Sequence, residues 1–326
     1  MLALKALLAL LTSFTVTVHT VDRQDFDDCH SAPYERRIAV CTRIAEDQSV
    51  MAKGRAYALS ERGYAREQEK QDFNGAVADY TEAIRIAPDY AYPYYRRGWL
   101  FQLASRYDAS VEDFNAAIRI EPNNALFLSL RGRSYHLMDD RALAMADFEQ
   151  AIRLKPKMAD TYRYRGKLYF DEGDKDRAIA DFSEAIRLEP DEVRGYAARV
   201  EVYQSLGQHD LAIADLTELA RLIPHSSDLF ETRGDSYRDA GKFDLAIADY
   251  TEAIRLAPSV PQAYHHRGVA YRLKGDREHA IADFRQAVRL APLASQDSLN
   301  ELQAMGVEGP KTERDALKQG VLDLLK

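Results

Sequence analysis

Apolar and polar positions between residues 159 and 192 follow the period of an α-helix. In the first half of this stretch, Tyr162, Gly166 and Tyr169 fall at i, i+4 and i+7, which places them on one face. The second half carries a similar apolar stripe, made of Ala178, Phe182, Ala185 and Ile186. Pro190 ends it. The pattern predicts two short helices joined by a turn, and such a pair needs neighbours to bury its apolar stripe.

The same pattern recurs along most of the chain. Prolines follow one another at intervals of 34 residues, at Pro88, Pro122, Pro156, Pro190, Pro224, Pro258 and Pro292. Most repeats carry an Arg-Gly pair in the first helix and an aromatic residue three positions after the glycine. A helix–turn–helix period of this length with this pattern resembles the tetratricopeptide repeat family.

The resemblance implies an all-α fold, a right-handed superhelical solenoid of seven helix–turn–helix units with N- and C-terminal capping helices. The expected units are 56–90, 91–124, 125–158, 159–192, 193–226, 227–260 and 261–294. Around them we expect a signal peptide or signal anchor in 1–20, a Cys-containing N-terminal cap in 21–55, and a C-terminal capping helix and tail in 295–326. The fifth unit departs most, with Val200 in place of the glycine and Leu219 in place of an alanine.

The N-terminal segment differs from the repeats. Lys5 is followed by thirteen uncharged residues, ALLALLTSFTVTV. A bilayer span needs about 20 apolar residues, so this run is more typical of a signal peptide. We expect an exported protein, periplasmic or secreted; a mis-annotated start or a cytosolic protein is the alternative. Whether the segment is cleaved or stays as an anchor is open. The leader that follows resembles that of exported bacterial repeat proteins.

The chain has two cysteines, Cys29 and Cys41, both ahead of the first repeat. An even number in an exported chain suggests a disulfide that pins an N-terminal cap over residues 26–48. Two unpaired thiols are the alternative. A metal site is not expected, because only His30 lies nearby.

Two charged positions recur in every unit. An arginine precedes the glycine position, and an aspartate precedes the aromatic or leucine residue of the second helix. In the five most regular units these are Arg97, Asp113, Arg131, Asp147, Arg165, Asp181, Arg233, Asp249, Arg267 and Asp283. The arginine borders the core stripe and needs a partner there, so we expect an internal Arg–Asp ladder. A row of phosphate-binding arginines is the alternative.

Side chains on the face of each first helix that lies opposite the core stripe vary from repeat to repeat. The resemblance implies that this face lines a concave groove for a protein or peptide partner. The expected groove residues are Tyr92, Tyr95, Arg96, Trp99, Arg133, Arg163, Tyr164, Lys167, Phe170, Arg238, His265 and His266. The single tryptophan, Trp99, lies opposite the core stripe, so we expect it to be partly exposed among Tyr92, Tyr95 and Arg96. The alternative is that it fills a gap against a neighbouring helix.

Composition narrows the function classes. The net charge of −8 argues against nucleic acid as the main partner. The sequence contains no phosphate-binding glycine loop, nucleophile elbow or zinc-protease motif, so we predict no enzymatic activity, no cofactor and no catalytic residues. The leading hypothesis is a non-catalytic adaptor of the cell envelope. Self-association into an assembly, or an accessory role in an envelope enzyme complex, are the alternatives.

Overall fold

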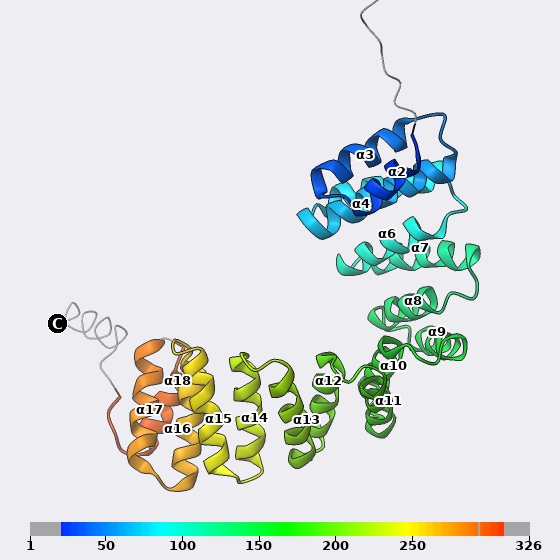
Figure 1. Cartoon of the computed structure of the whole chain (residues 1–326). Helices are drawn as coiled ribbons and strands as arrows, with labels where there is room; N and C mark the ends of the chain where they lie inside the picture. Colours follow the sequence, from blue (N-terminus) through cyan, green and yellow to red (C-terminus); the bar gives the residue numbers. More distant parts are fainter. Residues whose placement is uncertain (1–20, 293, 310–326) are drawn as a thin grey trace, which may run out of the picture. The chain divides into compact units, whose positions relative to one another are not determined.

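The computed structural model describes residues 21–292 and 294–309, and every regular element in this range is an α-helix (Figure 1). The expected signal segment in 1–20 and the tail from residue 310 lie outside the described residues. No helix that is described is both long and apolar enough to cross a membrane. The helices divide into two units, residues 1–155 and 156–326.

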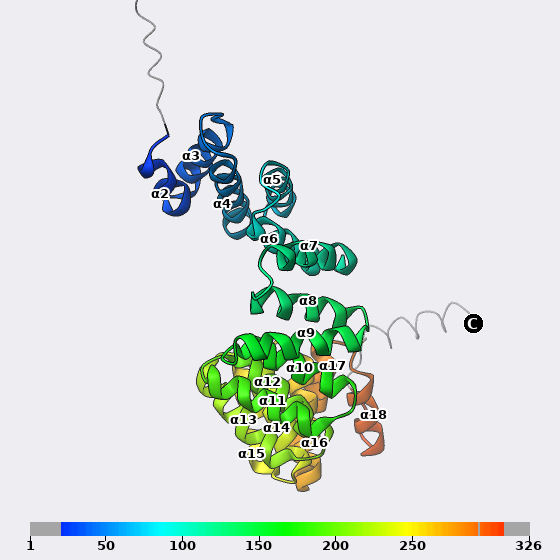
Figure 2. The same cartoon turned by 90° about the vertical axis from the view of Figure 1, so that its right-hand side faces the viewer.

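Unit 1 consists of consecutive helices, most of them paired by a short turn (Figure 2). Its helices are α2 (Arg23–Ser31), α3 (Tyr34–Glu46), α4 (Ala52–Lys70), α5 (Phe73–Ile86), α6 (Ala91–Leu103), α7 (Tyr107–Ile120), α8 (Ala125–Leu137) and α9 (Arg141–Leu154). Helix α4 packs along α5, α6 along α7, and α8 along α9. The first helices also touch one another, α4 with α6 and α6 with α8, so their side chains form one continuous surface within this unit.

Unit 2 repeats the arrangement. Its helices are α10 (Ala159–Asp171), α11 (Lys175–Leu188), α12 (Val193–Ser205), α13 (His209–Leu222), α14 (Ser227–Asp239), α15 (Phe243–Leu256), α16 (Pro261–Lys274), α17 (Arg277–Leu290) and α18 (Gln296–Ala304). Four helix pairs run from α10 to α17, and α18 packs on α17.

The glycine of the repeat allows the two helices of a pair to approach closely. A Cβ atom on Gly132 would lie 2.9 Å from the ring of Phe148, and one on Gly166 would lie 2.8 Å from the ring of Phe182. Such distances are shorter than van der Waals contact, so only glycine fits beside these buried rings. The glycine and the aromatic residue therefore act as one packing unit.

In the fifth repeat, different residues allow the two helices of the pair to pack closely. Val200 takes the glycine position, and the aromatic position is held by Leu216; both are buried in one cluster with Tyr196, Ala212 and Leu219. A smaller partner on the second helix leaves room for a larger residue on the first. This exchange explains how a repeat without the glycine still forms a regular helix pair.

Two short elements cover the ends of the helix array within their units. At the N-terminal end, Cys29, Val40, Cys41 and Ile44 pack with Ala58 of α4, and the two Sγ atoms lie 2.08 Å apart, at disulfide distance. Helix α2, which the sequence did not predict, forms part of this cap. Helix α4 begins at Ala52, inside the segment expected to be the cap.

At the other end, Leu302 of α18 is fully buried against Phe284 and Val288 of α17. Leu299 and Met305, which the sequence placed on the same stripe, pack on this cluster as partly buried side chains. Gly306 then adopts a left-handed backbone with φ of 68°, which ends the helix. The predicted C-terminal capping helix is therefore present.

Candidate protein-binding surface

The structure brings the repeated arginines and aspartates together as ion pairs. The closest nitrogen–oxygen distances are 2.6 to 2.8 Å. The pairs are Arg62–Asp79, Arg97–Asp113, Arg131–Asp147, Arg165–Asp181, Arg199–Asp215, Arg233–Asp249 and Arg267–Asp283. All seven are bidentate. In six of them Nε and Nη2 each donate to one carboxylate oxygen, and in Arg62–Asp79 Nε is shared between both oxygens. This geometry orients the guanidinium into the helix pair, so it is not presented to a ligand.

These pairs are largely withdrawn from solvent. The side chain of Asp147 is 8% exposed and that of Arg131 is 20% exposed. Burial raises the pKa of Asp113, and the hydrogen bond and charge of Arg97 act against that rise. A buried carboxylate of this kind depends on its arginine, so the pairs belong to the scaffold.

Four of these arginines, Arg97, Arg131, Arg199 and Arg267, also connect successive repeats. Arg131 donates through Nη1 to Asn115, which lies two residues after the aspartate of the preceding repeat, at 2.7 Å. Arg199 donates in the same way to Ser183, at 2.7 Å, and Arg267 to Thr251, at 3.0 Å. The sequence analysis did not anticipate this second contact.

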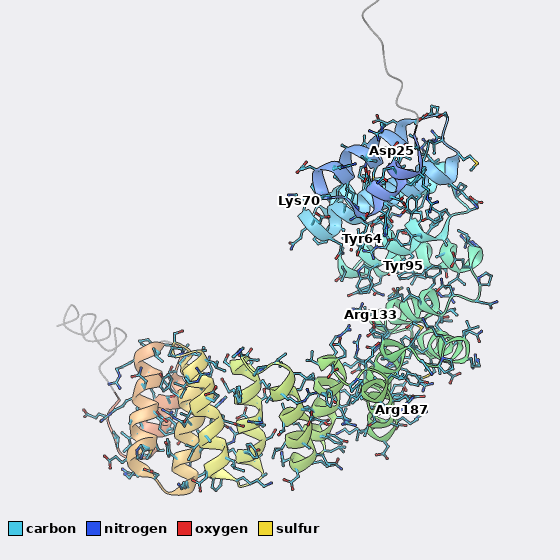
Figure 3. All side chains as sticks on the ribbon, in the orientation of Figure 1. Asp25, Tyr64, Lys70, Tyr95, Arg133 and Arg187 are labelled. Carbon is cyan, nitrogen blue, oxygen red and sulfur yellow. A yellow bond between two sulfur atoms is a disulfide. The ribbon has the colours of Figure 1, made fainter. Side chains whose placement is uncertain are left out.

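An aromatic surface extends over the first helices of unit 1. We call its members, Tyr64, Tyr92, Tyr95, Trp99 and Arg133, the aromatic face. All five side chains are half-buried. The rings of Tyr92 and Tyr95 are 5.9 Å apart. Figure 3 shows Tyr64, Tyr95 and Arg133 on the successive helices α4, α6 and α8. Burial raises the pKa of Tyr92, as expected for a ring packed among other rings.

Arg96 belongs to the support of this face. Its Nη2 lies 2.6 Å from Oε1 of Glu67, and only 11% of the Arg96 side chain is exposed. The guanidinium carbon also lies 4.7 Å from the ring centre of Tyr64 and 5.6 Å from that of Tyr95. We expected Arg96 in the groove, but its charge is compensated by a carboxylate of the same unit and is not displayed to a partner.

Trp99 takes up an intermediate position. It is half-buried and packs on the cluster of Ala76, Tyr80 and Leu100. The guanidinium carbon of Arg133 lies 5.3 Å from its ring centre, within the range of a cation–π contact. Trp99 therefore packs against neighbouring side chains, as in the gap-filling alternative, while its ring stays partly exposed. Its charged neighbour is Arg133 of the next repeat, whereas we expected Arg96.

The corresponding surface of unit 2 is charged. Arg163 lies 2.5 Å from Asp160 and stacks on Tyr164 at 4.7 Å. Lys167 lies 3.2 Å from Asp171 and 4.9 Å from the ring centre of Phe170. We call the members of this surface, Asp160, Arg163, Lys167, Glu201, Asp235, Arg238 and His266, the charged face.

Further along unit 2, the carboxylate of Asp235 accepts more than one hydrogen bond. Asp235 accepts from Arg238 at 2.7 Å and from the hydroxyl of Tyr250 at 2.7 Å. His266 lies 3.0 Å from Glu231. Burial alone would lower the pKa of His266, but the Glu231 carboxylate, as a hydrogen-bond acceptor for the imidazole, and the charges of Asp235 and Glu231 raise it overall. His266 is thus held in its charged form more strongly than a free histidine.

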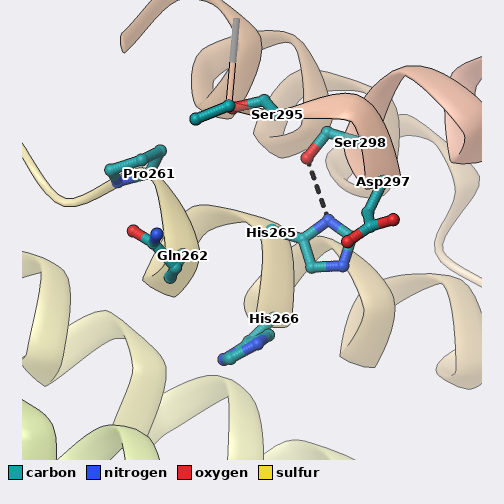
Figure 4. Close-up of a pocket in the computed structure, with 8 residues that line it drawn as sticks. Pro261, Gln262, His265, His266, Ser295, Asp297 and Ser298 are labelled. Atoms are coloured by element: carbon teal, nitrogen blue, oxygen red, sulfur yellow. Dashed lines mark hydrogen bonds between the residues drawn. The ribbon is translucent and has the colours of Figure 1, made fainter. Parts of the chain in front are cut away.

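The neighbouring histidine behaves in the opposite way. His265 Nδ1 lies 2.9 Å from the Ser298 hydroxyl of α18, as Figure 4 shows. Burial and the positive charge of His266 lower the pKa of His265. A pocket of about 200 Å³ adjoins this contact between α16 and the start of α18. It is smaller than the roughly 300–1,000 Å³ of typical small-molecule sites.

Comparison with models of known protein families identifies the repeat. Models of the tetratricopeptide repeat match residues 65–125, 127–158, 159–192 and 261–294, and a related model described as TPR repeat matches residues 234–275. The chain belongs to the tetratricopeptide repeat family. No curated protein matches the chain. The count of seven repeats stays a prediction, because no family model covers residues 193–233.

Two solved structures with TM-scores of 0.50 or more share the fold of this chain. The crystal structure of YrrB, described as a TPR protein with an unusual peptide-binding site, is 21% identical with a TM-score of 0.53, covering 59% of this chain and 99% of YrrB. A tetratricopeptide repeat protein from Parabacteroides merdae is 20% identical with a TM-score of 0.50, covering 75% of this chain and 97% of that one. A MamA structure is 22% identical with a TM-score of 0.49, covering 54% and 96%.

Several residues that shape the two faces were missed from the sequence. Glu67 and Gln102 lie at the repeat position that also gives Phe170 and Arg238, but we selected only aromatic and basic side chains there. Tyr64 lies at the position of Trp99 in the first tetratricopeptide repeat. A comparison of all repeats position by position, without regard to residue type, would have found them. Within the described residues, no group of His, Cys, Asp and Glu side chains could hold a metal ion.

Proposed function

We propose that this tetratricopeptide repeat protein is a non-catalytic scaffold that binds a protein or peptide partner on the aromatic face of unit 1. The observation that carries the proposal is the state of Tyr92, Tyr95 and Trp99. They lie half-buried on one helix, α6, whose Ala91 and Leu100 are packed inside. Large aromatic side chains that remain partly accessible beside an arginine have the composition of binding hot spots.

The support beneath this face favours binding without rearrangement. Tyr95 stacks on Phe127 of α8 at 5.6 Å, and Arg96 is fixed between Tyr64 and Tyr95 by Glu67. Side chains that are already held in place lose little rotamer entropy when a partner binds. A rigid aromatic surface of this kind suits a peptide that must be ordered on binding, and YrrB provides a family example of a described peptide-binding site.

We also propose that the protein functions after export, in the periplasm or outside the cell. The uncharged run after Lys5 and the pairing of Cys29 with Cys41 support this proposal. Both cysteines are fully buried between α2, α3 and α4, which suits a bond that stays closed. Mass spectrometry of the native protein under non-reducing conditions should find no free thiol, and two free thiols would contradict export to an oxidising compartment.

The binding proposal is tested by capture from the native compartment with three versions of the full chain. These are the wild type, Tyr95→Ala in unit 1, and Phe170→Ala in unit 2 as a matched control. We expect wild type and Phe170→Ala to retain the same partner and Tyr95→Ala to lose it, while circular dichroism shows that all three are folded. A partner retained equally by all three would contradict the assignment to unit 1. Recovery of this chain alone would favour self-assembly.

A further inference from the structure

The N-terminal cap is connected to the aromatic face through Arg37 of α3. The Nε atom of Arg37 donates to the backbone carbonyl of Cys29 at 3.0 Å, and its Nη2 lies 2.8 Å from Oε2 of Glu61 on α4. The guanidinium carbon also lies 5.6 Å from the ring centre of Tyr64, which belongs to the aromatic face. Arg37 is only 8% exposed, so its position depends on these contacts.

The series of contacts continues from Tyr64 into α6. The guanidinium carbon of Arg96 lies 4.7 Å from the ring centre of Tyr64 and 5.6 Å from that of Tyr95, both within the range of a cation–π contact. Glu67 of α4 holds this arginine at 2.6 Å. Contacts between neighbouring side chains therefore lead from Arg37 in the cap to Tyr95 on the surface proposed to bind a partner.

The position of the Cys29 carbonyl depends in turn on the cysteine pair. Helix α2 has nine residues, and the residues that it buries are Asp25 and Cys29. A helix of this length is not stable by itself in water. Cys29 is paired with Cys41 of α3, and both are fully buried beside Ala58 of α4. Without the bond between them, α2 would keep one partly buried ring, Phe26, and its ion pairs with α3 and α4.

Loss of the bond should therefore be felt at the aromatic face. A covalent bond between α2 and α3 limits the positions that α2 can sample, and so fixes the carbonyl that accepts from Arg37. When that carbonyl is free to move, Arg37 keeps Glu61 but is no longer held against Tyr64. A partner must then order these side chains as it binds, which lowers its affinity.

We propose that oxidation of Cys29 and Cys41 brings the aromatic face of unit 1 into its binding-competent arrangement. Arg37 is the positioning residue that connects the cysteine pair to Tyr64. The proposal rests on the proposed function and adds the regulation of the same face. Protein whose cysteines are still reduced, before or during export, binds its partner weakly.

The activating step is a thiol–disulfide exchange. As the bond between the two Sγ atoms forms, the two thiols lose two electrons and two protons, and a disulfide oxidant takes up both and leaves as a dithiol. Cys29 and Cys41 have no exposure once the cap is folded, so a reductant reaches them only when the cap opens. Activation is therefore a single event during maturation, and the oxidised state then persists.

Hydroxyl-radical footprinting of the full chain tests the connection without a ligand. Wild type is compared with Cys29→Ala/Cys41→Ala, and mass spectrometry gives the labelling rate of each tyrosine. We expect the rate at Tyr64 to rise about threefold in the double variant, because local opening exposes more of the ring. The rate at Tyr162, a half-buried tyrosine of unit 2, should not change. An unchanged rate at Tyr64 in a folded double variant would overturn the proposal.

A substitution of Arg37 tests its positioning role and does not require the cysteines to be changed. Arg37→Gln should raise the labelling rate at Tyr64 as the double variant does, while non-reducing mass spectrometry still finds no free thiol. Arg36→Gln is the matched control, because Arg36 is the preceding residue of α3, pairs with Asp28 and is 64% exposed. It should leave the rate unchanged. No rise with Arg37→Gln, or an equal rise with both variants, would contradict the role of Arg37.

Partner capture provides the second readout. The probe is the protein that wild type retains from the native compartment and Tyr95→Ala loses. We expect Cys29→Ala/Cys41→Ala to retain about fivefold less of it than oxidised wild type does. Equal retention would overturn the activation, although the binding face would stand. If no protein depends on Tyr95, the proposed function fails, and the labelling of Tyr64 still decides whether the cap and the face are connected.

Discussion

The first-helix surfaces of the two units are built on the same repeat positions but have different chemistry. In unit 1, Trp99 and its neighbours form a surface of half-buried rings, and the side-chain oxygens of Glu67 and Gln102 beside them already accept from arginines of the same unit. In unit 2 the equivalent positions carry charged residues such as Lys167 and Asp235, and most of them pair with one another. The positions that repeat determine the fold, and the positions that vary determine what each unit can bind.

Below these surfaces the two units are alike. Arg131–Asp147 in unit 1 and Arg165–Asp181 in unit 2 have nearly identical distances, 2.7 and 2.8 Å. Substitutions of the shared core should therefore affect both units equally, whereas substitutions of the surfaces should affect only one. The following predictions test that distinction, beginning with the largest effect.

Removal of a buried arginine should cost the most. Arg131→Leu and Arg165→Leu each leave an aspartate carboxylate buried without its partner, and each should lower the free energy of unfolding by about 3 kcal/mol. Urea unfolding followed by circular dichroism measures the loss. The double variants Arg131→Leu/Asp147→Leu and Arg165→Leu/Asp181→Leu should lose clearly less than the sum of their single changes. Additive losses would show that the members of a pair do not interact.

Replacement of the repeat glycine comes next. Gly166→Val places side-chain atoms against Phe182 and should lower the free energy of unfolding by about 2 kcal/mol. The fifth repeat, with Val200 beside Leu216, suggests the repair. Phe182→Leu introduced together with Gly166→Val should restore part of the loss, as measured by thermal melting. A double variant less stable than Gly166→Val alone would contradict this explanation of the fifth repeat.

The two surfaces should differ when partner binding is measured. Trp99→Ala should raise the Kd for the partner about tenfold, because it removes the largest ring of the aromatic face. Phe170→Ala in unit 2 serves as the control and should leave the Kd within twofold of wild type. Titration calorimetry with the captured partner provides the values, and melting curves separate the loss of binding from a loss of folding. An equal effect of both substitutions would remove the distinction between the units.

The smallest effect concerns pH and is limited to unit 2. The raised pKa of His266 means that its stabilising contribution is present below the unfolded pKa and is lost as the pH rises through the folded value. The lowered pKa of His265 means that stability falls as the pH drops from the unfolded towards the folded value. Asp297 and Glu301 of α18 oppose the second effect, and Arg238 of α14 reinforces it.

Two single substitutions distinguish the effect of His266 on the pH dependence of stability from that of His265. His266→Gln should lower the melting temperature at pH 6 more than at pH 8, and His265→Gln should lessen the loss of stability between pH 6 and pH 5. Each difference should correspond to less than about 1 kcal/mol, since both side chains keep some contact with solvent. Parallel pH profiles for the wild type and both variants would show that neither histidine is coupled to folding.

The recurrent features of the fold could be predicted from the sequence because the same residue types recur at the same positions of the repeats. The glycine, the aromatic residue and the proline predicted the helix pairs, and the proximity of arginine to the core stripe suggested a partner for it. Contacts made between repeats could not be predicted in this way. The stacking of Arg133 on Trp99 and the capture of Arg96 by Glu67 depend on which first helices touch and in what register, and no period contains that information.

The contact that several of the arginines make with the preceding repeat has a consequence for how such a chain can evolve. Arg131 donates to Asn115, and one repeat earlier Arg97 donates to the hydroxyl of Thr81. If residues 91–124 were deleted as a block, Arg131 would take the position of Arg97 and meet Thr81 at the same offset. Whole repeats can therefore be gained or lost by duplication or deletion while the hydrogen bond between neighbouring repeats is kept. An insertion of another length between the arginine and its acceptor would change their spacing. The number of repeats can thus change while the contact between neighbouring repeats stays the same.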